Sequence, residues 1–216
     1  MNLETARRQM IERQVRTWEV LEARVLETLQ GVPREAFVPE RYRKLAFSDT
    51  GIPLAHGQVM MEPRVEGRLL QALALQGEEQ VLEVGTGSGF LSACLAHLAR
   101  QVDTLEIHED LSAGAAGRLD ALGIRNVNLD VADATKFASN KTYDAIAVTA
   151  SAPRRLRRFE TALKPGGRLF IVIGEAPVME AMLITRAGDN AWTCESLFET
   201  SLPALVNAEQ PNRFRF

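Results

Sequence analysis

Apolar side chains recur at helical intervals along the first thirty residues of the chain. Between Met10 and Leu29 they follow one another at mostly three- or four-residue spacings, with Glu and Arg residues between them. This periodicity predicts a helical region over residues 3–30, which Gly31 and Pro33 would end. Further along, the pattern predicts a short helix over 39–46, irregular chain up to Pro63, and another helix over 63–76.

The pattern changes after Gly77, where short apolar runs begin to alternate with segments of helical length. Strands that alternate with helices in this way predict parallel βαβ units, with helices on both faces of one sheet. The expected strands are 81–84, 102–107, 127–131, 143–149 and 168–173, and the expected helices are 90–100, 109–121 and 153–163.

The last two apolar runs, 178–186 and 191–200, flank the turn sequence Gly188-Asp189-Asn190. A hairpin here predicts an antiparallel edge on an otherwise parallel sheet. The expected fold is therefore α/β: a doubly wound, mostly parallel seven-stranded sheet with an antiparallel C-terminal edge. We expect one domain over 1–216, in which a helical N-terminal layer (1–76) accompanies the α/β core (77–216).

Composition narrows the class of protein. The chain has 216 residues, 46% of them hydrophobic and 25% charged, which excludes a disordered chain. A net charge of −3 argues against a broadly basic surface, so nucleic acid is not an expected partner. The charged N-terminus and the absence of an uninterrupted apolar run of ~18 residues favour a cytoplasmic protein that does not enter membranes.

Two cysteines, Cys94 and Cys194, stand 100 residues apart without a CxxC partner. The spacing favours two reduced, buried thiols. With only three histidines in the chain, the ligands for a zinc site are too few, and no metal is expected.

A glycine-rich turn, Gly85-Thr86-Gly87-Ser88-Gly89, connects an expected strand to an expected helix. Its glycines allow a tight turn and a close approach of the backbone to a ligand. The third glycine comes one position too early for the dinucleotide fingerprint, and no GK[ST] follows to make a phosphate-binding P-loop. Glu83, two residues before the turn, suits a cationic ligand better than a pyrophosphate.

Acidic residues also follow the next two strands. Glu106 lies 21 residues after Gly85, where a carboxylate can accept both hydroxyls of a ribose. Asp133 follows the third strand and can reach an adenine amino group. Each could instead be a solvated strand end or a turn residue. Together they predict a ligand site at the carboxyl edge of the sheet.

These features resemble class I S-adenosylmethionine-dependent methyltransferases and, among them, the protein-L-isoaspartate O-methyltransferase family. The resemblance spans residues of about 10 to 175. It is carried by Val32-Pro33-Arg34-Glu35-Ala36-Phe37-Val38-Pro39, Ile52-Pro53-Leu54, His56-Gly57-Gln58, Val81 through Gly89, Val148 through Pro153, and Leu163-Lys164-Pro165-Gly166-Gly167-Arg168-Leu169.

The resemblance implies S-adenosyl-L-methionine as cofactor, S-adenosyl-L-homocysteine as its product, and transfer of a methyl group to a carboxylate of a protein or peptide. In the family this carboxylate belongs to L-isoaspartyl residues, and the reaction serves protein repair. The cofactor-binding residues it implies are Glu83, Gly85, Thr86, Gly87, Ser88, Gly89, Glu106, Ile107, Asp133, Ala134 and Thr149.

The acceptor segment departs from the family pattern. The family usually reads GQT-I-S, and its serine is the active-site residue; here the run is Gln58-Val59-Met60-Met61, with neither hydroxyl present. Likewise, the usual Gly-Asp-Gly is Ala132-Asp133-Ala134. The acceptor-side residues that the sequence indicates are the Met61 position, His56, Gln58 and Ser151.

A carboxylate acceptor is ionised at neutral pH, so its methylation requires no general base. The missing hydroxyls leave two alternatives open: a methyltransferase for another acceptor, or a non-catalytic module that binds the cofactor or a protein. Ser151 could instead cap or pack, and Met60 and Met61 could be plain core. Residues 154–158, with four arginines, form either a solvated helix face or a clamp for an anionic acceptor.

Overall fold

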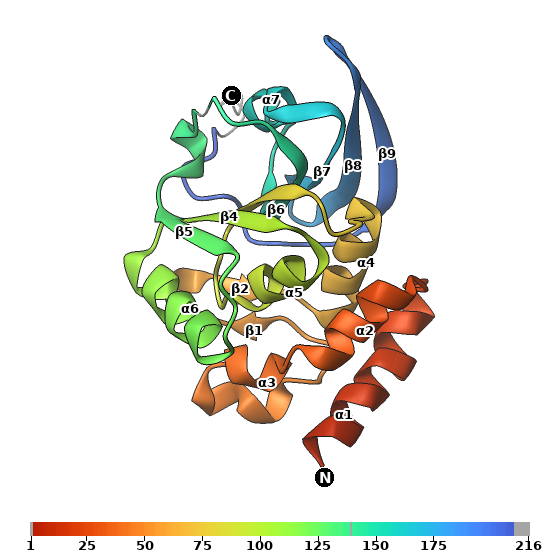
Figure 1. Ribbon diagram of the computed structural model, residues 1–216, viewed down its shortest axis with the longest axis vertical. Helices are drawn as coiled ribbons and strands as arrows, with labels where there is room; N and C mark the ends of the chain where they lie inside the picture. Colours follow the sequence, from red (N-terminus) through yellow and green to blue (C-terminus); the bar gives the residue numbers. More distant parts are fainter. Residues whose placement is uncertain (1, 139, 210–216) are drawn as a thin grey trace, which may run out of the picture.

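The computed structural model describes residues 2–138 and 140–209. Its centre is a seven-stranded sheet of order β5-β4-β3-β6-β7-β8-β9 (Figure 1). Strands β3 to β7 run parallel, and β8 is antiparallel to both β7 and β9. The predicted mostly parallel sheet with an antiparallel C-terminal edge is confirmed. The strands are β3 Gln80–Val84, β4 Gln101–Glu106, β5 Val127–Val131, β6 Tyr143–Ala152, β7 Leu163–Glu175, β8 Val178–Gly188 and β9 Ala191–Glu199.

The central strands are nearly continuous apolar runs because helices cover both faces of the sheet. In β3, Val81 and Leu82 are both fully buried, although their side chains point to opposite faces. Two apolar clusters result. One joins Val81 to α5 and the N-terminal helices, and the other joins Leu82 to Phe159 of α7.

The predicted core helices form, with small differences at their ends. Gly89, at φ +86°, precedes α5, and Glu109 and Asp110 in the first turn of α6 complement the dipole of that helix. The predicted helix over 153–163 shrinks to one short helix, because β6 extends as far as Ala152. The helices are α4 Pro63–Leu73, α5 Phe90–Leu98, α6 Glu109–Ala121 and α7 Arg157–Thr161.

The predicted helical region over residues 3–30, in the N-terminal layer, consists of several helical elements and is interrupted near Glu19. Glu19 adopts φ +60°, and the side chain of Gln71 replaces the missing helical partners there: its Oε1 accepts from the amides of Leu21 and Glu22. A tertiary contact from α4 therefore decides the break. The elements of this layer are α1 Leu3–Met10, a π-helical turn Ile11–Val15, a 3-10 turn Arg16–Trp18, α2 Ala23–Gly31, α3 Arg34–Phe37 and a 3-10 helix Glu40–Leu45.

A small second sheet lies where irregular chain was predicted. Strands β1, Ile52–Pro53, and β2, Val59–Met60, pair antiparallel, with Ile52 opposite Met60 and Pro53 opposite Val59. Ile52 and Met60 face the core, so Pro53 and Val59 face the other way.

Two further expectations can be compared with the structure. Cys94 is buried in α5 as predicted, whereas Cys194 is exposed, because it lies on the edge strand β9. Within the described part of the chain, no helix is both long enough and apolar enough to cross a membrane.

Candidate active site

A pocket opens at the carboxyl ends of β3, β4, β5 and β6. The chain runs from β3 outward to β5 and then returns to the other side of β3 as β6. A reversal of this kind leaves a crevice above the sheet in which ligands bind. The lining residues are Leu54, Gln58, Val59, Val84, Gly85, Gly87, Leu105, Glu106, Ile107, Ala132, Ala134, Thr149, Ala150, Pro203, Ala204, Leu205 and Val206.

The glycine turn brings bare backbone to this pocket. Gly85 has φ +96°, and a Cβ added to it would lie 2.3 Å from Thr149 Oγ1. That hydroxyl donates to the carbonyl oxygens of Val84 and Gly85, each at 2.9 Å. Gly87 also has a positive φ, +52°, and a Cβ there would meet Leu54 at 3.3 Å. Side chains at either position would therefore disturb the turn or its surroundings.

Glu106 ends β4 and holds its carboxylate in the pocket wall. Its Oε2 accepts from the amide of Gly87 at 2.8 Å, and its Oε1 accepts from the amides of Ile107 and His108 at 2.9 and 3.1 Å. The carboxylate is thus fixed beside the glycine turn. In this position it can accept the hydroxyls of a ribose, as the sequence predicts.

Glu83 lies inside the fold, where hydrogen bonds link it to the glycine turn, and it does not line the pocket. It is fully buried, and its Oε2 accepts from Ser92 Oγ and, at 2.7 Å, from Thr104 Oγ1. Because the Thr104 hydroxyl donates to Glu83, the Thr86 hydroxyl donates to Thr104 at 2.7 Å. This chain of hydroxyls ties the turn to the carboxylate.

Burial raises the pKa of Glu83 to about 7, against the hydroxyl donors of Ser92 and Thr104, which lower it. Its Oε1 has no hydrogen-bond partner among the described residues, which agrees with this direction. A folded-state pKa above the unfolded value of 4.5 gives stability that is complete below about pH 4.5. That contribution is lost as the pH rises through about 7.

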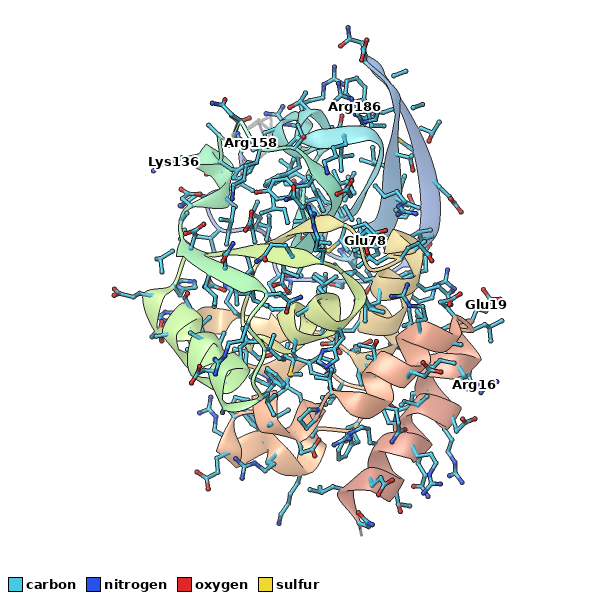
Figure 2. All side chains as sticks on the ribbon, viewed as in Figure 1. Arg16, Glu19, Glu78, Lys136, Arg158 and Arg186 are labelled. Atoms are coloured by element: carbon cyan, nitrogen blue, oxygen red, sulfur yellow. The ribbon has the colours of Figure 1, made fainter. Side chains whose placement is uncertain are left out.

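We therefore expect Glu83→Gln to flatten the dependence of stability on pH. Between pH 5 and 8 the wild type should lose about 3 kcal/mol of unfolding free energy through this group, and the variant should not. Urea denaturation across this range measures the difference. Glu78→Gln, on the exposed Glu78 of Figure 2, should retain the wild-type slope, and parallel curves for Glu83→Gln and wild type would contradict the assignment.

Asp133 lies beside the pocket and not in its lining. Its Oδ1 accepts from the amide and the hydroxyl of Thr135, at 2.9 and 2.6 Å, and so caps the short turn that follows β5. The hydrogen bonds from Thr135 hold the pKa of Asp133 below its usual value. The neighbours Ala132 and Ala134 supply the pocket surface at this end.

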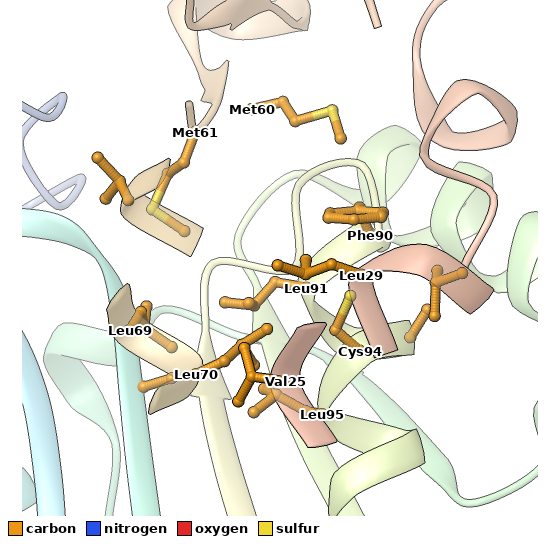
Figure 3. Close-up of a cluster of buried hydrophobic side chains, with 14 of the residues drawn as sticks. Val25, Leu29, Met60, Met61, Leu69, Leu70, Phe90, Leu91, Cys94 and Leu95 are labelled. Carbon is orange, nitrogen blue, oxygen red and sulfur yellow. The ribbon is translucent and has the colours of Figure 1, made fainter. Parts of the chain in front are cut away.

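The acceptor side of the pocket is formed by the small β1–β2 sheet. Alternation along β2 turns Val59 toward the pocket, with 36% of its surface exposed, and turns Met60 into the core. Met61 is only 5% exposed and packs among buried apolar side chains (Figure 3). The Met61 side chain does not line the pocket, which favours the alternative that it is plain core.

Arg34 fixes the backbone behind this segment. Its buried guanidinium donates to the carbonyl oxygen of Met61 at 2.7 Å and to that of Ala46 at 2.9 Å, and it forms an ion pair with the buried carboxylate of Glu66. Removing the guanidinium would leave a buried charge and two carbonyl groups without partners. Arg34 therefore sets the position of residues 59–61.

Neither His56 nor Ser151 lines this pocket. His56, at φ +57°, stacks on His108 with ring centres 4.0 Å apart and contacts Asp110 through Nε2 at 2.8 Å, outside the pocket lining. Ser151 is buried, and its hydroxyl donates to the carbonyl oxygen of Leu202 at 3.0 Å. The structure therefore favours the packing alternative for Ser151.

Two carboxylates pair with three of the four arginines in the cluster at 154–158. Arg155 and Arg157 both pair with the buried carboxylate of Glu160, and Arg154 pairs with Glu209. Figure 2 shows Arg158 in the upper part of the molecule, away from Arg16 in the N-terminal layer. The four arginines line a second pocket that shares Ala134 and Leu205 with the first, so a clamp for an anionic acceptor stays a prediction.

Of the predicted site residues, the structure places seven in the pocket lining: Gln58, Gly85, Gly87, Glu106, Ile107, Ala134 and Thr149. Thr86, Ser88 and Gly89 shape the glycine turn without lining the pocket, and Gly89 packs against Ala115 of α6. Sequence reasoning missed the apolar walls. No local signal indicates Val59 in its two-residue strand, and none places residues 203–206 against the strands.

A doubly wound sheet with a glycine turn after its first core strand, and with a carboxylate at the end of the next, is typical of class I S-adenosylmethionine-dependent methyltransferases. The family model of protein-L-isoaspartate(D-aspartate) O-methyltransferase (PCMT) matches residues 5–210. The chain belongs to this family.

Relatives and solved structures agree with this assignment. A protein-L-isoaspartate O-methyltransferase 1 of Rhodopseudomonas palustris is 37% identical over 205 residues, which cover 94% of this chain and 84% of the relative. A protein-L-isoaspartate O-methyltransferase 2 of Geotalea uraniireducens is 38% identical, over 88% of each chain. A Plasmodium falciparum structure named as a beta-aspartate methyltransferase (PCMT), in complex with S-adenosyl-L-homocysteine, has a TM-score of 0.81. It is 21% identical and covers 95% of this chain and 98% of its own, which shows the shared fold.

Proposed function

We propose that this protein is an S-adenosyl-L-methionine-dependent O-methyltransferase that methylates the side-chain carboxylate of L-isoaspartyl residues in proteins or peptides. The observation that carries the proposal is the pocket at the carboxyl ends of β3 to β6, in a chain that belongs to the PCMT family. When bound, the cofactor supplies an electrophilic methyl group on a sulfonium.

The residues of the pocket fit this cofactor. The bare backbone at Gly85 and Gly87 leaves room that a Cβ would fill, and the fixed carboxylate of Glu106 suits ribose hydroxyls. Apolar side chains of Val84, Leu105 and Ile107 make walls on which a planar base can pack.

The chain's contribution to catalysis is orientation and exclusion of water. The acceptor carboxylate is ionised at neutral pH, and the pocket needs no proton acceptor for it. Val59, Pro203 and Leu205 keep the lining apolar, which strengthens the attraction between the acceptor and a cationic donor. Gln58 is the one acceptor-side residue of the lining with a side-chain amide, which can donate to a carboxylate.

A second candidate function is supported by Val59, which presents an apolar side chain to the pocket where the family pattern has a hydroxyl. The protein would then methylate a different acceptor, one that needs no hydrogen bond at this point of the wall. The cofactor site would be the same in both cases.

An isoaspartyl peptide separates the two candidates. We expect calorimetric titration to show binding of S-adenosyl-L-methionine, and incubation of protein, labelled cofactor and peptide to release volatile methyl ester. The matched peptide with a normal aspartyl residue is the control and should give the blank. Cofactor binding without ester from the isoaspartyl peptide would overturn the first candidate, and methylation of another acceptor in an extract would then support the second.

A further inference from the structure

The chain after β9 returns across the carboxyl edge of the sheet as an extended strap, residues 202–207. The strap pairs with β6 at a single residue, Ser151, in a parallel bridge with Ala204. Ser151 donates from its amide to the carbonyl oxygen of Pro203 at 2.9 Å and accepts from the amide of Leu205 at 2.8 Å. With the bond from the Ser151 hydroxyl to Leu202, three hydrogen bonds fix this end of the strap.

Two polar side-chain contacts hold the chain near the other end of the strap: the contact of Asn207 with Asp133, and an exposed ion pair of Glu209 with Arg154 just beyond it. Asn207, in a left-handed backbone conformation at φ +62°, donates from Nδ2 to Asp133 Oδ2 at 3.0 Å. Asp133 is itself held by Thr135 through its other oxygen. The strap thus reaches from the end of β6 to the turn after β5.

Between these two attachments the strap forms one wall of the cofactor pocket, through residues 203–206. Beyond Leu202 its residues are half-buried or exposed, and a second cavity of about 540 Å³ borders residues 201–204. Leu205 is the strap residue beyond Leu202 that packs against a buried apolar cluster. The position of the strap therefore depends on this contact and on its hydrogen bonds at Ser151 and at Asp133.

We infer that Asp133 is a positioning residue: through Asn207 it latches the strap over the bound cofactor and slows the exchange of cofactor and product. The inference rests on the proposed function, because it concerns the same pocket. It assigns the Asp133 carboxylate to the strap, in place of the direct contact with adenine that the sequence suggested.

The test measures how fast S-adenosyl-L-homocysteine leaves the full-length protein, by displacement with excess S-adenosyl-L-methionine in a stopped-flow instrument. Asn207→Ala removes the latch, and we expect dissociation to become about three- to tenfold faster. The melting temperature should fall by about 2–4 °C, because the residue is exposed but alanine is less favourable than asparagine at φ +62°, by about 1 kcal/mol. Asn128→Ala is the matched control: Asn128 donates to Asp103 in the same way at 2.8 Å, but away from the pocket, and its loss should leave the dissociation rate within twofold.

Exchanging the acid and the amide of the Asp133–Asn207 pair gives a sharper test of the dissociation rate. Asn207→Asp sets a second carboxylate against Asp133, whose Oδ2 also lies 3.6 Å from the ammonium of Lys136. Dissociation should therefore be fast at pH 8 and should slow as the pH falls to 5, where one carboxylate begins to take up a proton. Asp133→Asn combined with Asn207→Asp restores a donor opposite an acceptor, and we expect it to return the rate to within about twofold of wild type at both pH values.

Three outcomes would overturn the inference. Unchanged dissociation in Asn207→Ala and Asn207→Asp would show that the strap is not latched at this point. A double variant that stays as fast as Asn207→Asp would show that the Asp133 carboxylate acts on the cofactor directly. A wild-type protein that binds no S-adenosyl-L-homocysteine would refute the proposed function together with the inference. Normal turnover of the wild type, with dissociation rates unchanged in the variants, would refute the inference alone.

Discussion

Gly85→Ala should bind S-adenosyl-L-methionine at least about a hundredfold more weakly than the wild type. Gly85 holds φ +96°, which costs an alanine about 1–2 kcal/mol. The new Cβ would also lie 2.3 Å from Thr149 Oγ1 and push that hydroxyl from the carbonyl oxygens of Val84 and Gly85. With the steric overlap and about 1 kcal/mol for the one hydroxyl hydrogen that the two carbonyl groups share, the binding conformation of the turn becomes about 3 kcal/mol less favourable. Calorimetric titration measures the change.

A matched control separates the clash from the backbone conformation. Gly123, in the turn between α6 and β5, also has a positive φ, +71°, but an added Cβ there would meet nothing within 4 Å. Gly123→Ala should therefore lose about 1–2 kcal/mol of stability and keep its cofactor affinity. Equal losses of affinity in both variants would mean that the pocket does not depend on the turn at Gly85.

A double variant tests the partner of the clash. In Gly85→Ala with Thr149→Ala, the nearest atom of residue 149 to the new Cβ becomes its own Cβ, at 3.7 Å. We expect part of the lost affinity to return, so that the two substitutions are not additive. Full additivity would show that Thr149 does not limit the space at position 85.

The parts of the fold that could be predicted are those whose signals lie within a few residues. The parallel strands are buried on both faces and therefore form continuous apolar runs, as in Val81-Leu82 and Ile146-Ala147-Val148. Glycines with positive φ mark the turn after β3, and Glu106 follows from its distance along the chain. Each of these features is decided by its own segment, which is why the sequence sufficed.

The features that could not be predicted depend on side chains far away in the sequence. The break at Glu19 depends on Gln71, and the strap depends on Ser151, which the sequence indicated for a different reason. The β1–β2 sheet has two residues in each strand, too few for an alternating pattern to stand out. Its register, and not sequence order, decides that position 59 faces the pocket.

The position of Met61 shows how the register of β1 and β2 determines which side chain can reach the acceptor. A comparison of motifs aligns Met61 with the family's active-site serine and suggests that Met61→Ser would restore the usual acceptor site. In the structure the Met61 side chain is 5% exposed and belongs to the core, while its carbonyl oxygen is held by Arg34. We expect Met61→Ser to lower the free energy of unfolding by about 4 kcal/mol, from the cavity and from the buried hydroxyl. Urea denaturation measures this loss.

The same reasoning predicts that a hydroxyl at position 59, two residues before Met61, raises the methylation activity. Val59→Thr is nearly equal in size, keeps the β-branched shape that suits β2, and places a hydroxyl in the lining of the pocket. Its stability should change by less than about 1 kcal/mol, since Val59 is already 36% exposed. If the acceptor is an isoaspartyl carboxylate, one added hydrogen bond should raise kcat/KM for an isoaspartyl peptide by about three- to tenfold.

One assay of both variants decides whether the acceptor contacts residue 61, as the motif comparison suggests, or residue 59, as the structure suggests. Faster methylation by Val59→Thr, beside a destabilised and no more active Met61→Ser, would place the acceptor against β2. A stable Met61→Ser with higher activity would contradict that arrangement, because its hydroxyl could reach the acceptor only if residue 61 left the core. A Val59→Thr variant that loses activity toward its own acceptor without gaining any toward the isoaspartyl peptide would favour the second candidate function, since the apolar wall would then be part of its specificity.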